Sequence, residues 1–235
     1  MNSEAPLAGH ISKRFDQELE DIRNRVLTMG GLVETQARNG VKCLIESDTR
    51  LAEEVVRKDQ EINQMEMEID HQCLQILARR QPAASDLRLI VAIIKTIADL
   101  ERIGDQAQKL GKYQLDLVDA GVSSSTFAKI EHLGELVSKN LHLALDAFAR
   151  MDVKDAMDTI ARDIKVNDEF EGLTRELITH MMEDPRTIAS ALRVSWSARA
   201  LERIGDHANN ICEYVVFLVE GKDVRHIEAI DQLDI

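Results

Sequence analysis

Aromatic residues, proline and glycine are scarce in this chain of 235 residues. Phe, Trp and Tyr together make up 3% of it, with 3 Pro and 11 Gly. Sandwiches and barrels of β-strands use aromatic and β-branched residues and frequent turns, so the composition argues against them. The common residues Leu, Ile, Ala, Glu, Arg and Met favour helices instead. At 44% hydrophobic residues the chain can bury a sizeable core. We therefore expect an all-α protein.

Positive charge is also in short supply. The chain has 29 Lys and Arg against 42 Asp and Glu, which gives a formal net charge of −13. A nucleic acid would be repelled by this field unless a local basic patch existed, and the sequence shows no such run. Nucleic-acid binding is therefore not expected. An acidic protein can still attract cations or the basic face of a protein partner.

Cysteine is rare, and long apolar runs are missing. Cys43, Cys73 and Cys212 are far apart, and no CxxC pair suggests a zinc or iron–sulfur site. Each lies among apolar residues at helical spacing, so we expect buried, reduced thiols. The first ten residues lack the pattern of a signal peptide, and no stretch approaches the roughly 18 apolar residues of a membrane span. These features predict a cytoplasmic protein that meets membranes only through partners.

Six long helices follow from the helix-breaking and capping residues. Asp48 and Asp152 each precede an amphipathic stretch, as helix N-caps do, and Pro82 cannot continue the helix before it. Asp184 with Pro185 begins the last helix, and a small polar stretch with a glycine, 119–126, is the clearest loop. The predicted helices cover about 12–46, 48–80, 85–118, 127–150, 152–182 and 184–221.

The two halves of the chain repeat each other. Leu100-Glu-Arg-Ile-Gly-Asp105 recurs as Leu201-Glu-Arg-Ile-Gly-Asp206, and Asp59-x-x-Ile-Asn63 matches Asp163-x-x-Val-Asn167. An internal repeat of this length indicates a duplicated unit. The sequence therefore predicts two tandem, sequence-related three-helix bundles with antiparallel helices, at 12–119 and 124–221.

Several carboxylates lie on the apolar side of their helices. On a helical wheel of about 100° per residue, Glu101 and Asp105 share an arc with Ile90, Ile94 and Ile97. Asp99, Arg102 and Lys109 instead fall on what reads as a solvated face. The other helices place further oxygen-bearing side chains inside the apolar arc: Asp59, Asn63 and Glu66; Asp163 and Asn167; Glu202, Asp206 and Asn209.

These inward carboxylates need a positive partner. A buried, unpaired carboxylate is costly or becomes protonated. Arginine partners, protonation and a metal cation are the three remedies. Oxygen ligands from two neighbouring helices suit Fe, Mn, Mg or Ca, and Zn also accepts such ligands. We expect a metal site in each repeat, while solvated or arginine-paired carboxylates remain the alternative.

Two other residues with metal-binding chemistry carry less weight. Glu68-x-x-His71 matches half of the pattern found in di-iron bundles, but it occurs once and falls on the polar face. His207 also falls on the polar side of its helix and is expected at the surface. Gly104 and Gly205 interrupt helices, which predicts the close approach of a neighbouring helix.

The doubled motif resembles the PhoU family. The resemblance spans about 11–221 and includes four further segments: Met29–Val33, Ala78–Arg88, Asp146–Asp152 and Ile211–Val215. It implies two three-helix bundles and a role in restraining the phosphate-starvation response when phosphate is plentiful. It also implies contacts with PstB, the ATPase subunit of the phosphate ABC transporter, and with the sensor histidine kinase PhoR. Members often form homodimers.

Family members can carry multinuclear metal clusters on paired Glu/Asp-x-x-x-Asp motifs. By this resemblance, Glu101 with Asp105 and Glu202 with Asp206 are expected ligands. Asp59 and Asp163 match the first positions of the partner motifs. The second positions are Asn63 and Asn167, which offer a carbonyl oxygen but no charge, so the sequence leaves metal affinity and nuclearity open.

Two functions from different classes therefore compete. The first is a regulatory adaptor of phosphate uptake without catalytic activity. The second is a carboxylate-bridged metal-storage bundle or a di-metal oxidase, which the missing second Glu-x-x-His disfavours. The sequence contains no phosphate-binding glycine loop and no nucleophile elbow that would indicate another enzyme.

Overall fold

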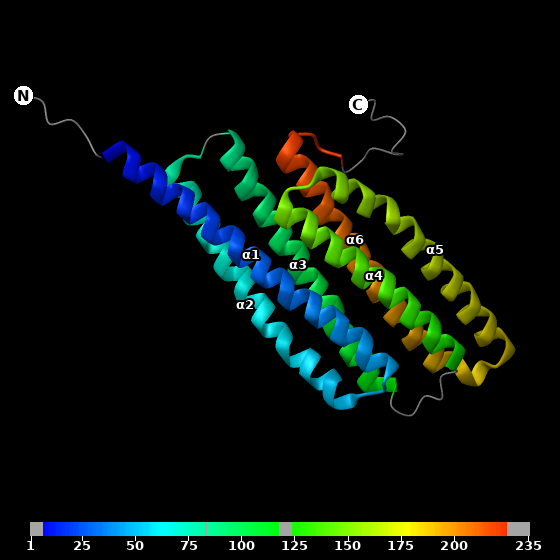
Figure 1. Ribbon diagram of the computed structural model, residues 1–235. Coiled ribbons are helices and arrows are strands. Elements are labelled where there is room, and N and C mark those ends of the chain that lie inside the picture. Colours follow the sequence, from blue (N-terminus) through cyan, green and yellow to red (C-terminus); the bar gives the residue numbers. More distant parts are fainter. Residues whose placement is uncertain (1–6, 83, 118–123, 225–235) are drawn as a thin grey trace, which may run out of the picture.

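The computed structural model describes residues 7–82, 84–117 and 124–224, which form helices without any strand. The described residues form six long helices. These helices lie side by side along a common direction (Figure 1). Their bounds are α1 Leu7–Ile45, α2 Thr49–Arg80, α3 Ala84–Leu117, α4 Ser124–Arg150, α5 Val153–Glu183 and α6 Ile188–Glu220, and a short 3₁₀ helix, η1 Pro185–Thr187, precedes α6.

Local capping interactions explain where these helices begin and end. The side chains of Asp48 and Asp152 accept hydrogen bonds of 3.0 Å from the backbone N–H groups of Leu51 and Asp155. Each bond satisfies one of the free N–H groups in the first helical turn. At the other end, α6 stops at Gly221, whose φ of 72° lies in the left-handed region that favours glycine.

The two repeats form two bundles that share a central seam. Helices α1, α2 and α3 pack together, as do α4, α5 and α6, while α3 and α6 also pack closely against each other (Figure 1). Contacts from Asp99 to Tyr214 and from Tyr113 to Trp196 show that α3 and α6 run antiparallel. Each of these two central helices is therefore covered on two faces, one by its own bundle and one by the other bundle.

The core is continuous across both bundles. Apolar residues from all six helices form one buried cluster, with Ile22, Met29, Ile97, Leu100 and Phe148 among its largest side chains. The three cysteines are free and buried. Burial raises the pKa of the Cys43, Cys73 and Cys212 thiols to about 12, so they are inert packing groups, as expected.

The predicted all-α architecture and the six helices are confirmed within the described residues. The helix ends differ from the prediction by a few residues, most at the start of α1, which begins at Leu7. Most of the predicted loop at 119–126 lies outside the described residues. None of the described helices contains a stretch with the length and hydrophobicity of a membrane span.

Candidate functional site

The first group of predicted ligands lies between α2 and α3. Asp59 is 3% exposed, and its Oδ2 accepts hydrogen bonds from Asn63 Nδ2 at 3.2 Å and from Gln108 Nε2 at 3.0 Å. The second carboxylate oxygen, Oδ1 of Asp59, and the Oδ1 of Asn63 are buried without a hydrogen-bond partner in the described part of the chain. Two buried acceptors are thus left unsatisfied on adjacent turns of α2.

Burial and mutual repulsion affect the carboxyl groups around Asp59. Burial raises the pKa of Asp59, and the nearby Asp105 raises it further. The pKa of Glu101 is raised first by burial and then by Asp105, Glu66 and Asp59. The pKa of Glu66 is also raised, by burial and by Asp70. Glu101 is therefore within electrostatic range of Asp105, Glu66 and Asp59, and Asp59 is within range of Asp105.

The second group lies between α5 and α6. Asp163 is 7% exposed, and Asn167 Nδ2 donates to its Oδ2 at 3.3 Å. Asn209 also donates to this carboxylate. Oδ1 of Asp163, Oε2 of Glu202 and Oδ1 of Asn209 are buried without a partner among the described residues. Asn167 is itself exposed, so it lies at the edge of the group.

The carboxyl groups of this second site are also perturbed. Burial raises the pKa of Asp163 to about 6, with a further contribution from Asp206. Burial likewise raises the pKa of Glu202 and of Asp206. Arg199 Nη1 forms an ion pair of 2.9 Å with Glu202 Oε1. One arginine partner, which the sequence analysis kept as an alternative to a metal, is therefore present at this site.

The glycine of the doubled motif explains how the helices approach these groups. A Cβ on Gly104 would lie 3.0 Å from Ile62 Cδ1 and 3.3 Å from Asp59 Oδ1. A Cβ on Gly205 would lie 3.1 Å from Asp163 Oδ1. A side chain at either position would press against the aspartate of the neighbouring helix, so glycine allows the helices to approach this closely. The predicted close approach at both glycines is confirmed.

The donor chemistry fits a cation that prefers oxygen ligands. Five of the buried, unpartnered oxygens belong to predicted ligands, and a bound cation would satisfy such acceptors. In the conformation described here, however, no three Asp, Glu, His or Cys side chains among the described residues converge closely enough to hold a metal ion. The oxygens lie between α2 and α3 and between α5 and α6, but they do not form a complete coordination shell.

Two sequence-based expectations are wrong. Asp99 and His207, both assigned to solvated faces, are 3% and 8% exposed. They lie at the seam where α3 of one bundle packs against α6 of the other, which buries a second face of each helix. Gln108, the donor to Asp59, was missed as well. It lies one helical turn beyond Gly104 on α3, and that spacing was the available signal.

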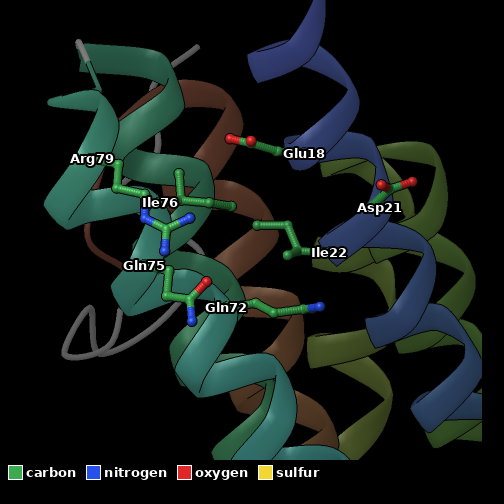
Figure 2. Close-up of a pocket in the computed structure, with 7 residues that line it drawn as sticks. All are labelled: Glu18, Asp21, Ile22, Gln72, Gln75, Ile76 and Arg79. Carbon is green, nitrogen blue, oxygen red and sulfur yellow. The ribbon is translucent and has the colours of Figure 1, made fainter.

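Other candidates lie away from these two groups. Glu68 and His71 are exposed, as expected from their place on the polar face. A pocket of about 150 Å³ lies between α1 and α2, and none of the predicted ligands lines it. Figure 2 shows the side chains that border it. Acidic, basic, amide and apolar side chains border it: Glu18, Asp21, Ile22, Gln72, Gln75, Ile76 and Arg79. Its small volume has room for a few water molecules.

Comparison with known proteins places these features in a family. The PhoU domain matches residues 26–113 and 130–215, one match in each bundle. The Pseudomonas aeruginosa phosphate-specific transport system accessory protein PhoU homolog is 51% identical over 221 residues, covering 94% of this chain and 91% of the relative.

Two crystal structures share the architecture. PhoU from Pseudomonas aeruginosa superposes with a TM-score of 0.86 at 50% identity, over 88% of this chain and 100% of that structure. The phosphate transport system regulatory protein PhoU from Streptococcus pneumoniae gives 0.83 at 30% identity, over 89% and 99% of the two chains. With both bundles matched and nearly the full length shared, the chain belongs to the PhoU family.

Proposed function

We propose that this protein is a regulatory adaptor of phosphate uptake and a negative regulator of the phosphate-starvation response. The observation that carries the proposal is 51% identity, over nearly the whole of both chains, to a protein named as an accessory of phosphate-specific transport. The Streptococcus pneumoniae relative is named as a regulatory protein of the same transport system. The proposal assigns the protein to the cytoplasm and gives it no catalytic activity of its own.

The adaptor would act by binding two partners. These are PstB, the ATPase subunit of the phosphate transporter, and the sensor histidine kinase PhoR. Six rods packed around one continuous core provide rigid outer surfaces for such contacts. The same proposal includes a homodimer, for which sedimentation of the purified chain is the direct measurement.

The adaptor proposal is tested in a strain that lacks the corresponding gene. Deletion should leave phosphatase expression high in phosphate-rich medium, and expression of this chain should restore repression. Purified chain should also retain PstB and the cytoplasmic part of PhoR on an affinity column. Normal repression in the deletion strain, or a failure to retain both partners, would contradict the adaptor function.

We also propose that a cation preferring oxygen ligands binds in each repeat. Asp59, Asn63, Glu66, Glu101 and Asp105 would hold it in the first repeat. In the second repeat, Asp163, Asn167, Glu202, Asp206 and Asn209 would hold it. The unsatisfied buried oxygens in both groups support this assignment. A bound Fe, Mn, Mg, Ca or Zn ion would neutralise the facing carboxylates and brace the helices of each bundle.

Metal analysis of two variants tests this assignment. Asp163→Asn combined with Glu202→Gln removes two charges from the second repeat and should abolish the metal bound there, leaving the first repeat loaded. Asp158→Asn, on the exposed side of α5, is the control and should bind as much metal as the unaltered chain. Equal metal content in all three proteins would exclude the proposed ligands. Turnover of O₂ by the loaded protein would instead favour the di-metal oxidase.

A further inference from the structure

The doubled motif contains an arginine that the proposed metal sites do not use. Arg102 and Arg203 occupy the same position in the two copies of Leu-Glu-Arg-Ile-Gly-Asp. The glutamate and aspartate of each copy face the interior of their own bundle. The arginine, between them in sequence, lies on a different face of its helix, the one that borders the seam between α3 and α6.

Both arginines line the same groove. It has a volume of about 450 Å³ and is bordered by one face of α3 and one face of α6. Besides Arg102 and Arg203 it is lined by Lys109 and Arg199, which makes four cationic side chains. No Asp or Glu is among its lining residues. In a chain of net charge −13, this grouping concentrates positive charge at one concave surface.

Among the described residues, three of these four cations form no close ion pair. Arg199 is paired with Glu202. Arg102, Lys109 and Arg203, in contrast, form no ion pair within 4.0 Å with any described residue. The nearest carboxylates act only through longer-range attraction, Glu101 on Arg102 and Glu202 with Asp206 on Arg203. Like charges that line one groove repel one another, and an anion in the groove would relieve this repulsion. The groove therefore favours a negatively charged ligand.

The other groove residues add polar and aromatic contacts. His207 is 8% exposed, and its Nδ1 lies 2.8 Å from Asp99 Oδ1. Because a carboxylate can only accept a hydrogen bond, this contact orients the ring and leaves Nε2 for a ligand. At the other end of the groove, the rings of Tyr113 and Trp196 pack with their centroids 5.9 Å apart. Trp196 remains 49% exposed and offers an open aromatic face.

We propose that this groove binds the phosphoryl group of a small molecule. The three cations without an ion pair match a group with two or more negative charges and several acceptor oxygens, and guanidinium groups bind phosphate in a bidentate manner. The volume lies in the range of pockets that hold small ligands. Inorganic phosphate supplies this chemistry alone, whereas a nucleoside monophosphate adds a base that stacks on Trp196. The inference does not depend on the proposed adaptor function.

The only tryptophan of the chain reports directly on the groove. The full-length protein is titrated with inorganic phosphate and, separately, with AMP, at constant ionic strength and with a chelator present so that no metal ion can capture the anion. We expect a saturable change in Trp196 fluorescence with at least one probe. A poly-glutamate peptide is titrated as a polyanion without phosphoryl groups. If neither phosphate nor AMP gives saturation, or if only this peptide does, the groove is not a phosphoryl site.

A pair of matched variants tests the role of the arginines. Arg102→Gln with Arg203→Gln should weaken binding by about 100-fold, since each lost charge-assisted contact is worth about tenfold in affinity. The control, Arg57→Gln with Arg175→Gln, removes the same charge from exposed positions on α2 and α5 and should change affinity by no more than about twofold. If both double variants bind the probe equally weakly, the loss of affinity comes from the change in net charge alone, and the proposal is overturned.

A third variant distinguishes the two sources of the phosphoryl group. Calorimetry replaces fluorescence for Trp196→Ala, which removes the aromatic face but keeps the four cations. If the physiological ligand class is a nucleotide, AMP binds the unaltered chain more tightly than phosphate does, and the variant loses this advantage. If it is inorganic phosphate, the two probes bind alike and the variant leaves both unchanged. Circular dichroism melting confirms that each variant is folded.

Discussion

His207 of α6 and Asp99 of α3 form a buried contact that joins the two bundles, with Nδ1 and Oδ1 2.8 Å apart. Asn210 Nδ2 donates to the same oxygen at 3.1 Å, and the Tyr214 hydroxyl donates to Asp99 Oδ2 at 2.8 Å. One carboxylate from the first repeat therefore accepts from three side chains of the second. Such a network fixes the register of α6 against α3 because no shifted packing would satisfy all of its members.

Replacing this carboxylate should destabilise the protein strongly. In Asp99→Ala, three donors of α6 lose their acceptor at a site where water has little access, so we expect a loss of about 2–4 kcal/mol. Urea unfolding followed by circular dichroism gives the value. The control Asp158→Ala, at an exposed position of α5, should stay within about 0.5 kcal/mol of the unaltered chain. A small effect of Asp99→Ala would show that the seam does not depend on this network.

Asp163 should make the metal-free protein less stable as pH rises. Its pKa is about 6 in the folded chain against an ordinary value of 3.8. Between these values the folded state binds the proton more tightly than the unfolded state. Stability therefore falls from about pH 4 to about pH 6, by up to about 3 kcal/mol, and stays reduced above that range.

Comparison with Asp163→Asn isolates this group from the other carboxylates. The amide cannot ionise, so the variant should become more stable relative to the unaltered chain between pH 4 and pH 7. Chemical unfolding of both metal-free proteins at several pH values measures the difference. A difference that does not vary with pH would mean that Asp163 ionises normally.

The arrangement of the carboxylates could be predicted from the sequence, but the seam between the bundles could not. A helical wheel places Asp59 and Asp163 on the apolar side of their helices. This prediction succeeds because α2 and α5 each have one buried face. The central helices α3 and α6 have two. The second buried face of α3 carries Asp99, and its partners lie more than 100 residues away in the chain. A helical wheel of one helix alone predicts that such a polar face is exposed to solvent.

The ion pair between Arg199 and Glu202 shows a different limit. The two residues are three apart on α6, a spacing at which side chains meet. The sequence therefore permits this pair, and it equally permits Arg199 to extend away from Glu202. Side-chain rotamers decide between the two, and periodicity contains no information about them.

Gly111 should be intolerant of a side chain, in contrast to Gly172. A Cβ on Gly111 would lie 2.9 Å from the backbone oxygen of Ala52, which cannot move without shifting α2. Gly111→Ala should therefore cost about 1–3 kcal/mol, despite the better helix propensity of alanine. A Cβ on Gly172 meets nothing within 4 Å, so Gly172→Ala should stabilise by up to about 1 kcal/mol. Thermal melts of the two variants should thus shift in opposite directions.

Asn63→Asp is the sharpest test of whether a cation belongs between α2 and α3. Asn63 Nδ2 now donates to Asp59 Oδ2 at 3.2 Å, so the substitution replaces a donor with a second negative charge at a buried carboxylate. Without metal, the variant should lose about 1–3 kcal/mol, because repulsion replaces a hydrogen bond. With metal, the added charge should increase affinity, and binding to the folded state alone should recover the loss or exceed it. Melting temperatures with and without added Mn²⁺ measure both effects, and Asn24→Asp on the exposed side of α1 should show neither. If Mn²⁺ stabilises the Asn63→Asp variant no more than the unaltered chain, these oxygens do not coordinate a cation.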